Sequence, residues 1–166
     1  MIYNLENRQL LTDSDLSVSI TRLKYVPNSE LLAAGLDDGR VLILSGDPLE
    51  FSTLFRHNDI VTHLDFSAAG QYGLSASFDS PLRVWETAAG RGLASLTTGA
   101  SPSGATFNPA NNTVVYSAVG LRSWTWDADT MIAAACARLQ RNFTEVEWRT
   151  YFGEHADYQQ TCPGLP

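Results

Sequence analysis

The sequence has few cysteines, little positive charge and no long hydrophobic run. Its 166 residues carry 11 lysines and arginines against 18 aspartates and glutamates, a net charge of −7 at pH 7. Without a basic stripe, we expect no nucleic-acid partner. The longest apolar segment, residues 131–137, is far shorter than the ~20 residues that span a bilayer. The N-terminus has no secretory signal pattern, so the expected location is cytoplasmic, with no membrane partner.

The two cysteines, Cys136 and Cys162, are too few for a disulfide framework and too widely separated for a zinc knuckle. We expect two reduced thiols packed in a small terminal subdomain. A disulfide between them is the alternative, and a cytoplasmic location disfavours it. His63 and His155 have no partner at the spacing of metal ligands, so we expect neither a metal nor a cofactor.

The sequence does contain a repeat of 41 residues. Phe66 and Phe107 are separated by this interval, as are Trp85 and Trp126. Three segments align without a gap: "ITRLKYVPNSELLAAGLDDGRVLIL", "VTHLDFSAAGQYGLSASFDSPLRVW" and "PSGATFNPANNTVVYSAVGLRSWTW". Repeats of this length are typical of solenoids, propellers and arrays. Within each copy, alternating stretches such as "VTHLDF" and turn sequences such as "SAAG" predict four antiparallel strands, which is one propeller blade.

The middle copy resembles the WD-repeat family. His57, Ser75, Asp79 and Trp85 stand at the positions of that family's histidine, strand serine, turn aspartate and WD tryptophan. The last copy keeps the tryptophan–aspartate pair that begins at Trp126. The resemblance implies a buried structural tetrad, in which the aspartate accepts from the imidazole, the imidazole meets the serine hydroxyl, and the hydroxyl meets the indole N–H. A catalytic Ser–His–Asp triad is the alternative, which we reject because Ser75 would lie mid-strand, without oxyanion donors.

The first copy keeps only the turn aspartate, Asp38, and has Leu16, Ala34 and Leu44 at the other three positions. Ile2 and Tyr3 align with the end of a third strand two periods later, so residues 1–12 are expected to be the stub of a further blade.

The predicted fold is all-β: a partial β-propeller of about three four-stranded antiparallel blades plus a stub strand, with a small α-helical C-terminal cap. The expected boundaries are a stub at 1–12, blades at about 16–55, 57–97 and 98–127, and the cap at 128–166. Three blades cannot close a ring, and their open edges invite pairing. Either the chain is the C-terminal part of a longer propeller, or it completes a ring with its own copies or a second protein.

Past Trp126 the period ends and helical composition begins. Asp127 or Asp129 is expected to cap a helix running to about Gln140. The second helix has a capping box, Thr144 with Glu147, which predicts its first turn. Phe143 and Trp148 can form the hydrophobic staple of this helix, Trp148, Tyr151 and Phe152 share one face, and Gly153 ends it.

This tail, "C…RNFTEVEWRTYFG…Y…TCPGLP", resembles the C-terminal module that follows WD-repeat propellers in bacterial signalling and defence proteins, which carry a STAND-type ATPase or a caspase-like protease. The resemblance implies a structural cap over the last blade; specific docking by the module is the alternative.

We therefore predict a non-catalytic module for protein–protein interaction, the sensor or docking end of a bacterial signalling or defence protein. An autonomous, self-assembling propeller scaffold is the alternative. An enzyme with a channel active site would have to use Arg22, Lys24, His63 and Asp65, which we interpret as structural. The expected interaction surface is the face built by the turns between second and third strands, and by those between blades; its predicted contact residues are Arg56, Asn58, Phe78 and Arg122.

Overall fold

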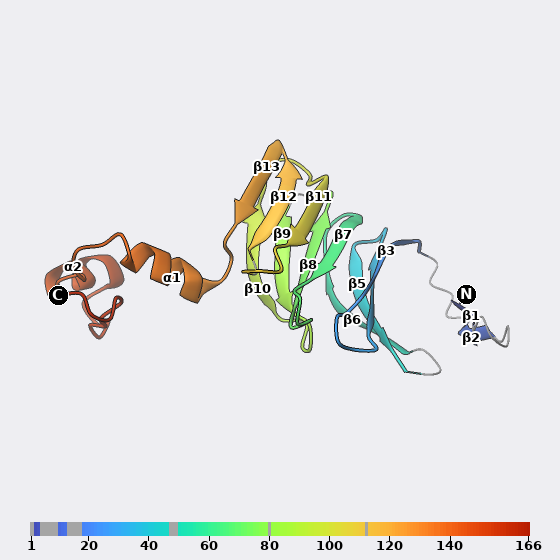
Figure 1. Ribbon diagram of the computed structural model, residues 1–166, viewed down its shortest axis with the longest axis horizontal. Helices are drawn as coiled ribbons and strands as arrows, with labels where there is room; N and C mark the ends of the chain where they lie inside the picture. The colour runs from blue at the N-terminus through green and yellow to red at the C-terminus, as the bar shows by residue number, and fades with distance from the viewer. Residues whose placement is uncertain (1, 4–9, 13–17, 47–49, 80, 112) are drawn as a thin grey trace. The chain divides into compact units, whose positions relative to one another are not determined.

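The blades form three successive antiparallel sheets in the computed structural model, which describes residues 2–3, 10–12, 18–46, 50–79, 81–111 and 113–166 (Figure 1). The chain divides into two units, Met1–Trp126 and Asp127–Pro166. The first unit holds the sheets and the second holds both helices. The predicted all-β blades with a helical C-terminal segment are therefore confirmed.

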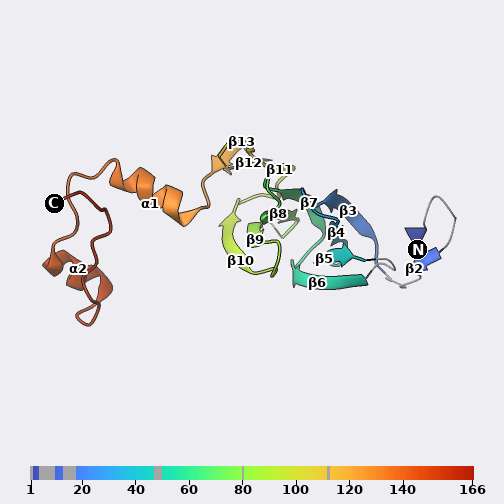
Figure 2. The same cartoon turned by 60° about the horizontal axis from the view of Figure 1, so that its bottom comes forward.

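Each blade is a meander in which consecutive strands pair. The first blade contains β3 (Ile20–Tyr25), β4 (Leu32–Leu36), β5 (Arg40–Ser45) and β6 (Glu50–Arg56). The second contains β7 (Val61–Phe66), β8 (Tyr72–Ser77), β9 (Pro81–Glu86) and β10 (Gly92–Thr97). Figure 2 shows β3, β7 and β11 following one another on one side of the array, with β6 and β10 on the other.

The third blade has three strands in the described residues, β11 (Gly104–Phe107), β12 (Val114–Ala118) and β13 (Gly120–Trp124), one fewer than each of the first two blades. The chain enters a helix instead, because Asp127 caps it by accepting from the Thr130 amide at 2.8 Å. At the other end of the unit, β1 (Ile2–Tyr3) pairs with β2 (Leu10–Thr12) in a separate two-stranded sheet.

The core lies between neighbouring blades. Alternation along the strands sends Ala33, Val41 and Ile43 of the first blade toward Val61 and other side chains of the second. A second cluster joins the second blade to the third; its buried members are Leu74, Ala76, Leu82, Val84, Phe107, Val114, Tyr116 and Trp126. A third cluster, Ala34, Leu36, Leu42 and Leu44, lies within the first blade.

One repeat position also connects the three innermost strands through polar contacts. Asp65 of β7 pairs with Lys24 of β3 at 3.2 Å, and it accepts from the Thr106 hydroxyl of β11 at 2.6 Å and the Phe107 amide at 2.9 Å. Lys24, Asp65 and Thr106 are successive copies of one position in the repeat. Burial acts to raise the pKa of Asp65, but these hydrogen bonds outweigh it and hold the pKa below its usual value. The contacts support our structural interpretation of this lysine–aspartate pair.

The second unit contains α1 (Ala128–Cys136) and α2 (Glu145–Phe152). The predicted capping box and staple of α2 are present: Thr144 accepts from the Glu147 amide, and the rings of Phe143 and Trp148 lie 6.3 Å apart. Gly153 ends the helix with a φ of 95°. The prediction that α1 reaches Gln140 is wrong, since it ends at Cys136. Turn bonds such as Arg138 N to Ala135 O at 3.0 Å follow in place of further helix.

The two cysteines form a disulfide, with a Cα–Cα distance of 5.4 Å, so the expectation of reduced thiols is wrong. The reason lies in the fold of the second unit. The buried Asn142 side chain accepts from the Cys162 amide at 2.8 Å and donates to the Cys162 carbonyl at 3.0 Å. These bonds hold the C-terminal segment beside the end of α1, where the 26-residue separation in sequence gave no sign of proximity.

Neither helix among the described residues is long and apolar enough to cross a membrane.

Candidate interaction surface

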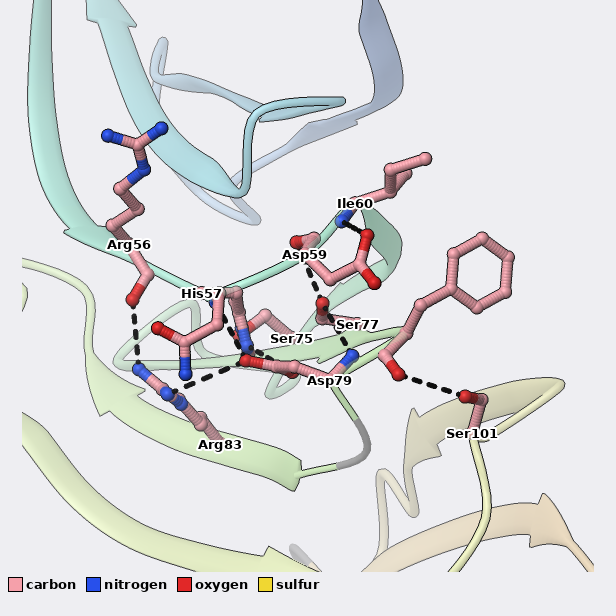
Figure 3. Close-up of polar contacts among 11 residues, drawn as sticks. Arg56, His57, Asp59, Ile60, Ser75, Ser77, Asp79, Arg83 and Ser101 are labelled. Carbon is pink, nitrogen blue, oxygen red and sulfur yellow. Dashed lines mark hydrogen bonds and ion pairs between the residues drawn. The ribbon is translucent and has the colours of Figure 1, made fainter.

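The turn between β8 and β9 is built on a buried hydrogen-bond chain (Figure 3). His57 Nε2 lies 2.8 Å from the Ser75 hydroxyl oxygen, and its Nδ1 lies 3.3 Å from Asp79 Oδ1. A neutral imidazole with its proton on Nδ1 satisfies both contacts, donating to the carboxylate and accepting from the hydroxyl. The structure therefore brings together three of the four predicted tetrad residues, at the start of the turn.

His57 stays uncharged in this site. Its side chain is fully buried, and burial, aided by the charge of Arg83, lowers the pKa of His57 to about 4. The carboxylate of Asp79 acts in the opposite direction and does not overcome burial. A neutral imidazole satisfies both contacts, so the geometry of the chain is consistent with the lowered pKa.

Trp85 departs from the predicted tetrad. Its ring is fully buried, but its indole N–H has no hydrogen-bond partner among the described residues, so the expected bond to the serine hydroxyl is absent there. The ring is held by packing: Phe55 and Phe66 contact it edge-on, each with ring centroids 5.5 Å away. A Cβ atom placed on Gly73 would lie 2.2 Å from this ring, so only glycine fits below it.

Phe78 is fixed at the tip of the same turn. Its amide donates to the Ile60 carbonyl at 3.1 Å, and its own carbonyl accepts from the Ser101 hydroxyl, which belongs to the turn leading to the next blade, also at 3.1 Å. Its side chain is 54% exposed. The backbone is thus held on both sides while the aromatic ring faces solvent.

Sequence reasoning missed the residues that brace this turn. The buried Ser77 hydroxyl donates to the Asp59 carbonyl at 2.8 Å and accepts from the Asp79 amide at 3.2 Å. Their only sequence signal is the concentration of serine and aspartate around the turn, which is typical of side chains that bond to nearby backbone. The partners lie in separate turns, which the sequence alone does not pair.

Arg56 and Asn58 flank His57 on this surface, and both are exposed. Arg56 donates to the Asp38 carbonyl at 3.0 Å, while its own carbonyl accepts from Arg83 at 3.1 Å. The Asn58 amide donates to Asp79 at 2.8 Å, which leaves its side chain at the surface. Arg56, Asn58 and Phe78 therefore surround one turn network, which we call the Asp79 turn.

Arg122, the fourth predicted contact residue, lies on β13 of the third blade, where it pairs with Tyr116. It is exposed, but among the described residues no hydrogen bond or ion pair joins it to the Asp79 turn. The structure therefore groups three of the predicted contact residues and places the fourth on another blade.

In the first copy, Ala34 and Leu44 stand at the positions of Ser75 and Trp85, and both are buried in an apolar cluster. Leu16 lies outside the described residues. Asp38 instead pairs with Arg40 at 2.7 Å, which together with the Arg40 amide lowers the pKa of Asp38 despite the opposing effect of burial. The first blade thus replaces the polar chain with apolar packing and an ion pair.

Comparison with known proteins identifies the repeat. Residues 50–86 match the family described as WD domain, G-beta repeat. These residues are a WD40 repeat. They include the whole His57–Ser75–Asp79 chain and Trp85, the features that carried the resemblance in the sequence.

Two solved structures share the WD40 propeller fold. RRP9 WD40 repeats give a TM-score of 0.59 at 19% identity, covering 70% of this chain and 37% of that one. The Cps50 (Swd1) beta-propeller domain of Myceliophteria thermophila gives 0.53 at 25% identity, covering 60% of this chain and 32% of that one.

Among curated relatives, U3 small nucleolar RNA-associated protein 21 homolog of Schizosaccharomyces pombe is 31% identical over 124 residues, 72% of this chain. Protein groucho of Drosophila melanogaster is 29% identical over 91 residues, 55% of this chain. The chain spans only 14% and 12% of the lengths of these two proteins. The similarity is therefore to short segments of much larger proteins.

Proposed function

We propose that this chain is a non-catalytic WD40 module that docks a protein partner on the face carrying the Asp79 turn. The observation that carries the proposal is Phe78, an aromatic side chain that is 54% exposed on a backbone held from both sides. A fixed, exposed aromatic side chain suits an interface hot spot, because little conformational freedom is lost on binding. Arg56 adds an exposed arginine to the same turn network, and Arg122 extends the proposed surface to the next blade.

The proposal includes further blades against β3. Blade repeats allow a like-for-like comparison: Val61 and Phe66 of β7 are 0% and 5% exposed under the first blade, whereas their equivalents in β3, Ile20 and Tyr25, are 42% and 70% exposed. Covering a large apolar side chain stabilises by about 1.5–3 kcal/mol. Exposure on this scale supports a ring in which another blade lies on β3.

We further propose that the complete protein acts in signalling in the cytoplasm, and that this chain is its sensor or docking end. Support for this role is the resemblance of residues 136–163 to the C-terminal module of bacterial signalling and defence proteins. The relatives named above are eukaryotic and give no support to a bacterial source.

The docking face is tested by comparing the partners that co-purify with wild type, Phe78→Ala, Arg122→Ala and a control, Leu93→Ala. Leu93 is an exposed apolar residue of β10, away from the Asp79 turn. We expect at least one partner to bind Phe78→Ala at least tenfold more weakly, about 1.4 kcal/mol, and the control unchanged. If Phe78→Ala and Arg122→Ala leave every partner's affinity unchanged, the surface is wrongly assigned.

A second candidate is an autonomous scaffold in which copies of this chain close the ring. The same exposed side chains of β3 favour it, since a second copy could cover them as well as another blade could. The two candidates differ in the mass of the isolated chain.

A further inference from the structure

A pocket of about 400 Å³ lies between the first two blades, at the ends of the strands opposite the Asp79 turn. Three turns form it: residues 26–31 between β3 and β4, 69–72 between β7 and β8, and 86–88 between β9 and β10. Strands alternate in direction within a meander, so these turns are at the other end of the sheets from the turn of Phe78. The volume is within the range of pockets that take ligands.

The pocket walls are preorganised. Gly70 has a φ of 73°, and a Cβ atom added there would lie 2.4 Å from the Pro27 carbonyl oxygen, so the turns of the two blades touch. Thr87 ties the third turn to the second, because its amide donates to the Gln71 carbonyl at 2.9 Å. Within the first turn, the Val26 amide donates to the Leu31 carbonyl at 2.9 Å. A ligand would therefore find the site formed.

The lining has an apolar floor and a single charge. Val26 and Leu31 provide the floor, whereas Ala69 and Ala88 stand exposed at the rim. The exposed rim makes the pocket accessible to a side chain carried on another polypeptide. Its size and apolar floor suit one aliphatic or aromatic side chain.

Glu86 is the charged residue of the lining. Its Oε2 pairs with Arg91 at 3.2 Å, and no hydrogen bond of its Oε1 is found in the part of the chain that the structure describes. A lysine or arginine next to the inserted side chain can reach that free oxygen. The net charge of −7 also favours a basic partner.

Thr87 adds a polar group to the wall. The residue is 6% exposed, and its hydroxyl has no hydrogen-bond partner among the described residues. The hydroxyl oxygen is itself buried, so a ligand on the pocket surface does not contact it.

From these features we infer a peptide-binding site between the first two blades. It takes a segment of a partner protein in which one apolar side chain, seated on Val26 and Leu31, neighbours a lysine or arginine that pairs with Glu86. The site is separate from the Asp79 turn, so the two surfaces can hold a partner at two points or two partners at once.

The test selects random seven-residue peptides, displayed on phage, against the 166-residue chain, with an unrelated acidic protein as counter-selection. Synthetic versions of the enriched peptides are then titrated by fluorescence anisotropy against wild type and four variants. Ala88→Arg and Ala69→Arg obstruct the pocket from two different turns, so one remains informative if the other unfolds. Glu86→Gln removes the charge, and Phe78→Ala is the control on the opposite face.

We expect enriched peptides to share an apolar residue beside a lysine or arginine, and both obstructing variants to weaken binding at least tenfold. Glu86→Gln should weaken the binding of these peptides about three- to tenfold. It should not weaken the binding of peptides with norleucine in place of the basic residue. Phe78→Ala should leave affinity unchanged, which keeps this result independent of the docking face. The inference is overturned if no peptide is enriched, if enriched peptides lack the pair, or if folded obstructing variants bind like wild type.

Discussion

Acid is expected to destabilise the second blade chiefly through His57, before any carboxylate takes part. Folding holds the pKa of His57 at about 4, against an ordinary value of 6.5. The unfolded chain therefore binds more protons between these two values, and the free energy of unfolding falls as pH decreases through that window. Above 6.5 the full stabilisation is present. Integrating from pH 7.5 to pH 5 gives a loss of about 2 kcal/mol from this one group.

The measurement is urea unfolding at pH 7.5, 6 and 5, followed by tryptophan fluorescence. The variant His57→Gln has no titrating group at position 57 and should lose most of this pH dependence. His63 will leave a smaller remainder in the same direction, because burial lowers the pKa of His63 as well. The matched control is His155→Gln, which replaces an exposed histidine outside the blades. Equal pH dependence in wild type and His57→Gln would refute the assignment of a buried, neutral imidazole.

Three further outcomes follow from the contacts described. Gly73→Ala should lower the free energy of unfolding by about 1–3 kcal/mol, because the indole ring of Trp85 occupies the space of the new methyl group. The control is Gly92→Ala, where no atom lies within 4 Å of the added methyl group. It should lower the free energy of unfolding by less than about 1 kcal/mol in the same urea titration. Asp65→Asn should lower the free energy of unfolding by about 1–2 kcal/mol, and the variant should lose less of its stability than wild type as the pH falls below 3.8. A melting temperature equal to that of wild type would contradict the role of Asp65 between blades. Reducing the disulfide with dithiothreitol should raise hydrogen exchange in residues 127–166 and leave the blades unchanged; equal exchange in both redox states would show that the bond contributes nothing there.

The repeat made most of the fold predictable. Three copies at one period locate the strands, because each copy must alternate and turn at the same places to pack against its neighbours. The capping box and staple of α2 were equally legible, since they depend on residues close in sequence. The end of the repeat was also visible, because the period stops at Trp126 and Asp127, one of the two expected caps, starts the helix.

The residues of the site that belong to the WD motif were predictable, and the contacts outside the motif were not. His57, Ser75 and Asp79 meet as expected because the motif encodes that geometry. The bond from Ser101 to the Phe78 carbonyl joins two blades, and no motif marks it. The disulfide was missed for the same reason, since the Asn142 bonds that bring the cysteines together are visible only in the folded module.

The claim that another blade or a second copy of the chain packs on β3 is tested most directly by the solution mass of the isolated chain. The mass is measured by light scattering on a sizing column over a range of concentrations. We predict a mass above the 18.2 kDa of one copy, because Ile20 and Tyr25 leave apolar surface exposed on β3. A fixed oligomer with a sharp thermal transition would favour the self-assembled ring. A mass that rises with concentration would favour a propeller completed by other blades. A stable 18.2 kDa monomer at every concentration, with a sharp thermal transition, would contradict the claim.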